Sequence, residues 1–224
     1  MAVYDLEEQE QLSELRTWWK INGNRVLMFV AALALGSVGY QGWNWYQRSQ
    51  AAEASMLYAK VRAAASAGDA KAAREAAGEL IGRYSRTAYA GLGVLLAAKA
   101  QYEAGDVKNA QAELAWAAEH SPDPGLGDVA RLRLAGLLAE QKAYDDALRR
   151  LGPEPVAPLA GRYAELKGDI YAAQGKAGEA RSAYRSAMAL SAEAKGEAAS
   201  TDEARRTGES LRERVQIKLD ALGE

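Results

Sequence analysis

The stretch LKGDIYAAQGKAGEARSAYRSAMAL, residues 166–190, decides the fold of this chain. Its two halves are rich in alanine, the strongest helix former, and Gly175-Lys176 separates them. Glycine supplies the left-handed conformation that ends a helix, and the next polar residue starts another. The stretch therefore predicts two antiparallel helices joined by a tight turn. The residues that define this hairpin are Gly168, Tyr171, Gly175, Ala180, Tyr184 and Ala187.

The same pattern recurs upstream, with its key alanines at positions 73, 110 and 147, so that the spacings up to Ala180 are 37, 37 and 33. These spacings bracket the 34-residue period of tetratricopeptide repeats. An alanine is expected where the second helix of a hairpin crosses the first at short range. A single hairpin cannot bury its own apolar face, so the hairpins stack. The chain is predicted to be all-α, with an α-solenoid of three to four such hairpins over residues 54–190.

The units are not equally regular. The first, residues 54–84, matches worst, and an alternative is that it partly continues a preceding helix. The third runs into residues 152–158, where three prolines stop the helix. Residues 191–224 are expected to hold a loose segment, up to about Thr201, and a C-terminal capping helix. The apolar face of that cap is formed by Leu211, Val215, Leu219 and Leu222.

A membrane anchor is predicted for residues 26–46. The stretch 26–47 carries no charge, and its 22 residues reach about 33 Å as a helix, enough for a hydrocarbon core of about 30 Å. It ends in Trp43, Trp45 and Tyr46, which suit a membrane–water interface. Two alternatives are a buried core helix and a cleaved signal peptide, since Ala52-Glu53-Ala54 has the small-x-small form of a cleavage site.

Positive charge favours one orientation of this anchor. Arg16, Lys20 and Arg25 precede it, whereas Arg48 stands alone after it. The positive-inside rule then predicts a cytoplasmic tail over residues 1–25 and a repeat domain on the other side of the membrane.

Small residues follow one another along the anchor and would allow close packing with a partner helix. The alternative is that glycine is simply common in membrane-spanning helices. The anchor-packing residues are Ala32, Gly36, Gly39 and Gly42.

Several functional classes find no support in the sequence. The net charge of −2 argues against nucleic-acid binding, and the absence of cysteine excludes a disulfide framework and a thiolate metal site. The single histidine, His120, cannot form a histidine cluster or a Ser–His–Asp triad. We therefore expect no enzyme, no catalytic residue, no metal and no cofactor.

Protein binding remains, and the first helix of each hairpin is expected to line the groove of the solenoid. This predicts a groove with an apolar end beside a charged end, suited to an extended segment of a client protein. The alternative for the leucines is that they are core. The predicted groove residues are Leu92, Leu95, Lys99, Tyr102, Val129, Leu132, Arg162, Glu165 and Asp169.

The order of these segments resembles the YfgM family of tetratricopeptide repeat proteins, the ancillary subunits of the bacterial Sec translocon. The resemblance covers nearly the whole chain and is weakest at residues 91–127 and after Ser191. It rests on an acidic tail, Asn22-Gly23 before the anchor, Gly42-Trp43 at its end, Leu132-Arg133-Leu134-Ala135, Ala147-Leu148, Gly168-Asp169, Gly175-Lys176 and the run from Gly178 to Tyr184.

This resemblance implies a single-pass protein of the bacterial inner membrane with a periplasmic repeat domain. It implies association with the Sec translocon channel and with a membrane-anchored periplasmic isomerase-like chaperone, and assistance to exported client proteins. The alternative is an envelope scaffold that assembles a complex without contacting nascent chains.

Overall fold

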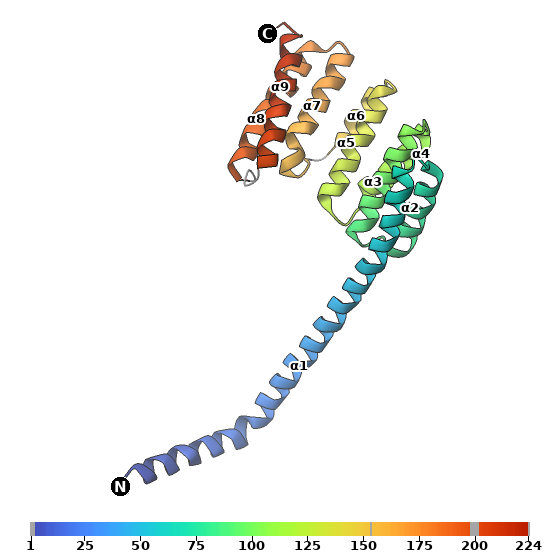
Figure 1. Ribbon diagram of the computed structural model, residues 1–224. Helices are drawn as coiled ribbons and strands as arrows, with labels where there is room; N and C mark the ends of the chain where they lie inside the picture. The colour runs from blue at the N-terminus through green and yellow to red at the C-terminus, as the bar shows by residue number, and fades with distance from the viewer. Residues whose placement is uncertain (1–2, 153, 198–201, 224) are drawn as a thin grey trace. The chain divides into compact units, whose positions relative to one another are not determined.

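The computed structural model of the chain describes residues 3–152, 154–197 and 202–223, and every regular element in these ranges is a helix (Figure 1). The predicted all-α fold class is therefore confirmed. The chain divides into two compact units, Met1–Gln50 and Ala51–Glu224. The described helices are α1 (Val3–Ser66), α2 (Ala70–Tyr84), α3 (Ala88–Glu103), α4 (Val107–His120), α5 (Pro124–Glu140), α6 (Tyr144–Leu151), α7 (Ala157–Ala173), α8 (Ala177–Glu197) and α9 (Asp202–Asp220).

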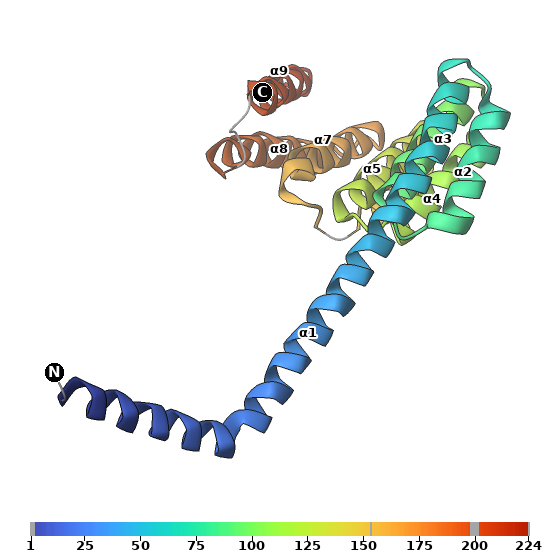
Figure 2. The ribbon, with the colours of Figure 1, turned by 60° about the horizontal axis from the view of Figure 1, so that its bottom comes forward.

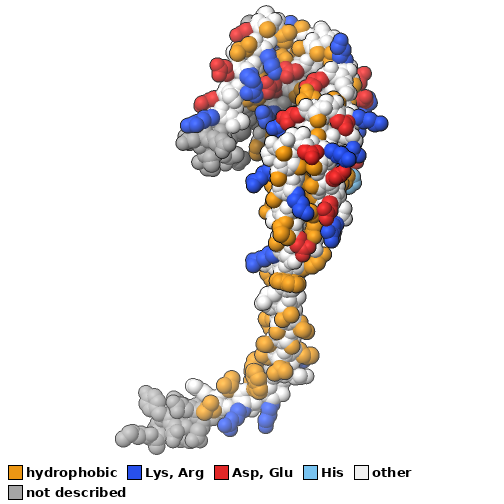
Figure 3. Space-filling view, turned by 45° about the vertical axis from the view of Figure 1, so that its right-hand side comes forward, with side chains coloured by type: hydrophobic (Ala, Val, Ile, Leu, Met, Phe, Trp, Pro, Cys, Tyr) orange, Lys and Arg blue, Asp and Glu red, His pale blue; other side chains and the backbone are white. Residues whose placement is uncertain are grey.

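The first unit consists of the N-terminal part of α1, which is the one described helix that is long and apolar enough to cross a membrane. Its large apolar side chains are exposed, and Figure 3 shows a row of them along one face of the helix; Leu35, for example, is 74% exposed. Such a surface is stable only when lipid or protein covers it. The predicted anchor-packing residues Ala32, Gly36, Gly39 and Gly42 all lie exposed along it, and a partner helix there stays a prediction.

The last turns of α1 belong to the second unit and form the first helix of the first hairpin. Leu57 and Val61 are buried there, and both lie in apolar clusters shared with residues of α2. The hydroxyl of Tyr84, at the end of α2, donates to Glu53 Oε2 at 2.5 Å. The first helix of this hairpin is thus the C-terminal part of α1, which also contains the apolar run. The helix is continuous because residues 46–66 contain neither glycine nor proline.

The turns inside the four hairpins share one backbone conformation. Gly68, Gly105, Lys142 and Gly175 all have positive φ, at 73°, 81°, 61° and 75°. At each turn two backbone N–H groups bond back to the end of the preceding helix; at the second turn, Asp106 N donates to Gln101 O at 2.8 Å. This is the hydrogen-bond pattern of a glycine-ended helix. Lys142 adopts it without being glycine, at a cost in backbone strain.

The four key alanines are buried completely, each with 0% exposed surface: Ala73, Ala110, Ala147 and Ala180. Each alanine follows its positive-φ residue by five positions. In every hairpin, the small side chain of this alanine thus lies at the point where the second helix crosses the first. Consecutive helices contact each other from α2 to α9, and α3, α5 and α7 also contact in series (Figure 1 and Figure 2). This is the predicted solenoid of stacked hairpins.

The third hairpin is cut short. Helix α6 has 8 residues and is followed by a non-helical connection to α7. The buried carboxylate of Asp128, on α5, holds this connection, because its Oδ2 accepts from Val156 N at 2.7 Å and its Oδ1 pairs with Arg131. The hydroxyl of Tyr163, on α7, donates to the backbone oxygen of Asp128 at 2.8 Å. One residue thus joins the helices on both sides of the gap.

Helix α9 lies against α7 and α8 and closes the C-terminal end of the stack. Leu211, Val215 and Leu219 are buried against Tyr184 and Ala187, as predicted for a capping helix. Helix α8 reaches Glu197, beyond the predicted start of the loose segment at 191, because its alanine-rich sequence favours helix even without large apolar residues. Residues 198–201 of that segment lie outside the described part of the chain.

The strained turn gives a test of the repeat geometry. We expect Lys142→Gly to raise the free energy of unfolding by about 0.5–1 kcal/mol, since relief of left-handed strain outweighs the extra chain entropy of glycine. The reverse change, Gly105→Lys, should lower it by a similar amount or more. Urea unfolding of the full chain in detergent micelles, followed by circular dichroism, measures both. A stabilising Gly105→Lys would contradict the assignment.

Candidate protein-binding surface

A hollow of about 310 Å³ lies on the first-helix face of the second unit, between α3 and α5. Leu137 and Leu114 form an apolar floor, and Lys99 and Arg133 bring two cations to it. The residues that line this α3–α5 hollow are Ala98, Lys99, Tyr102, Leu114, Arg133, Gly136, Leu137 and Glu140.

A glycine keeps the hollow open. Gly136 lies 37 residues after Lys99, so the two occupy equivalent positions in successive repeats. A Cβ built on Gly136 would meet nothing within 4 Å, which means that the backbone there faces free space. The absence of a side chain at this one position therefore creates room that the neighbouring repeat fills with Lys99.

The acids around the hollow are already engaged. The hydroxyl of Tyr102 donates to Glu140 Oε2 at 2.9 Å, and this bond raises the pKa of Tyr102. Lys99 pairs with Glu103 at 3.5 Å on the exposed surface, where such a pair contributes little. An incoming chain would meet hydrogen-bonded carboxylates and accessible cations.

Arg133 differs from these residues. Its Nη1 donates to the backbone oxygen of Leu95 at 3.4 Å, and no ion pair joins it to a described acid. Partial burial and the nearby charge of Arg162 lower its pKa. A guanidinium that is partly desolvated and faces a like charge favours an anion beside it.

The structure distributes the predicted groove residues over three environments. Lys99 and Tyr102 line the hollow. Four apolar residues are buried or half-buried. Leu95 and Val129 belong to one core cluster, and Leu132 packs against another. Leu92 is half-buried. Arg162 is exposed, whereas Glu165 and Asp169 are held by the capping helix.

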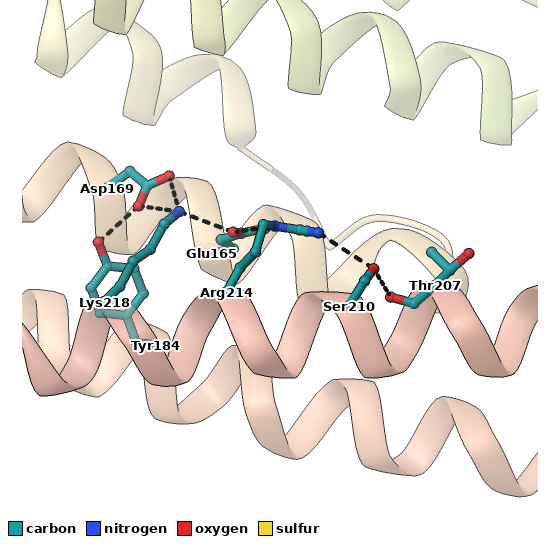
Figure 4. Close-up of polar contacts among 7 residues, drawn as sticks. All are labelled: Glu165, Asp169, Tyr184, Thr207, Ser210, Arg214 and Lys218. Carbon is teal, nitrogen blue, oxygen red and sulfur yellow. Dashed lines mark hydrogen bonds and ion pairs between the residues drawn. The ribbon is translucent and has the colours of Figure 1, made fainter.

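Figure 4 shows how α9 engages the charged end of the predicted groove. Lys218 Nζ lies 2.9 Å from Glu165 Oε1 and 2.7 Å from Asp169 Oδ1. Arg214 Nη2 lies 3.2 Å from Glu165 Oε2, and the Tyr184 hydroxyl donates to Asp169 at 2.8 Å. The network satisfies both carboxylates within the chain, which leaves the α3–α5 hollow as the more available part of the face.

Burial opposes ionisation of Glu165, but the hydrogen bonds from Arg214 and Lys218 outweigh it and lower the pKa of this carboxyl below its ordinary 4.5. Burial and the bond to Asp169 raise the pKa of Tyr184. Both shifts favour an ionised Glu165 beside a neutral Tyr184 at physiological pH.

The sequence predicted only Lys99 and Tyr102 of this hollow, and it missed the other lining residues, which are Ala98, Leu114, Arg133, Gly136, Leu137 and Glu140. The 37-residue repeat spacing could have revealed Gly136. It aligns Gly136 with Lys99, so that a glycine stands where the neighbouring repeat has a long side chain. The periodicity of apolar residues alone does not reveal a missing side chain on the surface.

The described side chains include acidic residues and one histidine. No group of three or more His, Cys, Asp or Glu among them could hold a metal ion. His120 stacks on Trp116, with ring centroids 5.3 Å apart, and its Nδ1 lies 3.0 Å from the backbone oxygen of Trp116. This places the histidine in a local contact at the end of α4.

Comparison with known proteins agrees with this architecture. The family model described as a tetratricopeptide repeat-like domain matches residues 16–224. The chain is 32% identical over 190 residues to the ancillary SecYEG translocon subunit of Neisseria gonorrhoeae, covering 84% of this chain and 90% of that protein. It is 29% identical over 186 residues to the protein of the same name in Haemophilus influenzae (83% and 91%) and 26% identical over 188 residues to that of Escherichia coli (84% and 90%).

The Glu165 network predicts an acid-sensitive cap. Because the pKa of Glu165 is lowered in the folded chain, its stabilising effect is present above about pH 4.5 and is lost as the pH falls through the folded pKa. We expect Glu165→Gln to lower the free energy of unfolding by about 1 kcal/mol at pH 7, after allowance for solvent screening, and by much less at pH 3.

Urea unfolding of the full chain at the two pH values measures this difference. Glu179→Gln, an exposed change on α8, is the matched control. An equal loss of stability for Glu165→Gln at pH 7 and pH 3 would rule out the ionic contribution.

Proposed function

The chain belongs to the tetratricopeptide repeat-like family of ancillary SecYEG translocon subunits, and from this premise we propose that it is a membrane-anchored, protein-binding subunit of the Sec translocon. A stack of hairpins supplies surface and an exposed apolar helix supplies a tether, which together suit an adaptor better than an enzyme. We propose no catalytic step.

We propose that the N-terminus is cytoplasmic and that the repeats lie in the periplasm of the inner membrane. The support is the charge distribution, with Arg16, Lys20 and Arg25 before the apolar run and Arg48 alone after it.

The absence of native cysteine makes this orientation directly measurable. We expect Ser186→Cys in the repeat unit to react with a membrane-impermeant maleimide in intact spheroplasts, and Gln11→Cys in the tail to react only after the membrane is permeabilised. Both positions are exposed in the structure, so lack of access reports the membrane side. The reverse labelling pattern would overturn the orientation.

The α3–α5 hollow is the observation that carries the binding role. Its apolar floor fits one large side chain of an extended polypeptide, and Lys99 and Arg133 suit an acidic group beside that side chain. We propose that the hollow receives segments of exported proteins as they leave the channel, together with a membrane-bound chaperone that takes them further.

The second candidate is an envelope scaffold that touches no nascent chain. Two observations favour this scaffold. Leu95 is buried in the core, and α9 pairs with Glu165 and Asp169. These predicted groove residues therefore stabilise the fold and do not face a free groove. The two functions differ in whether filling the α3–α5 hollow has any effect on client contact.

Gly136→Trp fills the hollow, and the free space around a Cβ at this position should allow the chain to fold. We expect crosslinks from a photoreactive residue at Lys99 to a stalled export intermediate to fall about tenfold, which corresponds to the loss of one buried apolar side chain, about 1.5 kcal/mol. Crosslinks from the anchor to channel subunits should not change.

Gly178→Trp is the matched control, because this helical glycine also has nothing within 4 Å of a built Cβ and lies on α8, away from the hollow. Unchanged client crosslinks in Gly136→Trp, or none in the unaltered chain, would favour the scaffold.

A further inference from the structure

A second hollow, of about 240 Å³, opens on the opposite helix layer, between α2 and α4. These are the second helices of the first two hairpins, so this site is separate from the α3–α5 hollow and does not rest on the function proposed for it. The residues that line this α2–α4 hollow are Arg74, Ala77, Gly78, Ile81, Val94, Asn109, Ala112, Glu113 and Trp116.

Glu113 is the unusual residue of this site. Its Oε2 atom is buried without a hydrogen-bond partner, whereas buried carboxylates in folded proteins are normally bonded. The walls around it are largely apolar, and no ion pair joins it to a described cation. The site therefore contains a buried acceptor that none of the described groups satisfies.

The charges that face Glu113 are few. Arg74, on α2, attracts the ionised form, Asp106, at the start of α4, repels it, and α3 contributes only the apolar Val94. Burial has the largest effect and raises the pKa of Glu113 from 4.5 to about 7. The carboxyl is thus poised between its two forms near neutral pH, and a cation beside it would favour the charged one.

Size and shape limit what can fill the space. Small-molecule sites generally measure about 300–1,000 Å³, so this hollow suits a single side chain. A lysine has an aliphatic stem that packs on Ile81 and Trp116 and one compact ammonium for one acceptor. An arginine prefers to bond both oxygens of a carboxylate, and only Oε2 is both buried and without a partner here.

We propose that the α2–α4 hollow is a docking site for a lysine side chain on an apolar segment of a partner protein, with Glu113 as its acceptor. The incoming ammonium binds the carboxylate form. A neutral Glu113 therefore releases its proton when lysine binds. Because the ionised fraction of a group with a pKa of about 7 rises about tenfold between pH 6 and pH 8, binding strengthens over this range by up to that factor.

Disulfide tethering tests the site without an identified partner. The full chain, which has no native cysteine, is prepared with Gly78→Cys, a position that lines the hollow and has free space around a built Cβ. It is equilibrated with equal amounts of cystamine and bis(2-hydroxyethyl) disulfide, and intact mass spectrometry gives the ratio of the amine adduct to the hydroxyl adduct. Gly82→Cys, one turn along α2 and outside the hollow lining, provides the reference ratio.

We expect the amine to be preferred about fivefold more at position 78 than at position 82 at pH 7.5, the effect of a weak ion pair of about 1 kcal/mol. The preference should fall to the reference ratio in Glu113→Gln, a change of nearly equal size, and should be weaker at pH 6 than at pH 8. Circular dichroism of each variant verifies that the helices are retained.

Three results would overturn the proposal: equal ratios at the two positions, a preference that survives Glu113→Gln, or a preference that appears only when Arg74→Gln is added. The last would mean that Arg74 already occupies the site as the partner of Glu113.

Discussion

Each hairpin of this protein depends on a chain reversal through a left-handed residue, followed five positions later by an alanine. The reversal is possible at low cost for glycine, which occupies it at 68, 105 and 175, and at a higher cost for Lys142. The alanine then lets the two helices cross at the distance of a methyl group. Because these two requirements are local, every unit has the same turn and the same close helix crossing, even where the second helix is short, as in α6.

The first-helix face of this stack differs between its C-terminal end and its middle. At the C-terminal end, Arg214 and Lys218 of α9 neutralise Glu165 and Asp169, so carboxylates of the first-helix face become part of the internal structure. In the middle, Gly136 carries no side chain, and Arg133 donates to the backbone oxygen of Leu95 and forms no ion pair with a described acid. On this first-helix face, the available surface lies over α3 and α5.

Periodicity predicted the hairpins well, and it located even the turn at Lys142, where the residue type itself gives no signal. It could not predict which groove residues stay accessible. The engagement of Glu165 depends on a helix 49–53 residues away, which reaches it only in the folded chain. The same holds for Glu113, whose lack of a partner results from what surrounds it on α2 and α3. Helix α8 is longer than expected because alanine favours helix without marking burial.

The short α6 has a consequence for how the repeat unit comes apart. On one side of the α6–α7 connection lie the apolar clusters around Val94 and Leu80, and on the other lies the cluster around Tyr184 and Val215. The seam between them is bridged by a further apolar cluster, which includes Ala135, Leu151 and Tyr163, and by the polar bonds of Asp128. Opening of the C-terminal half would therefore expose this shared cluster, which couples the two halves across the short α6.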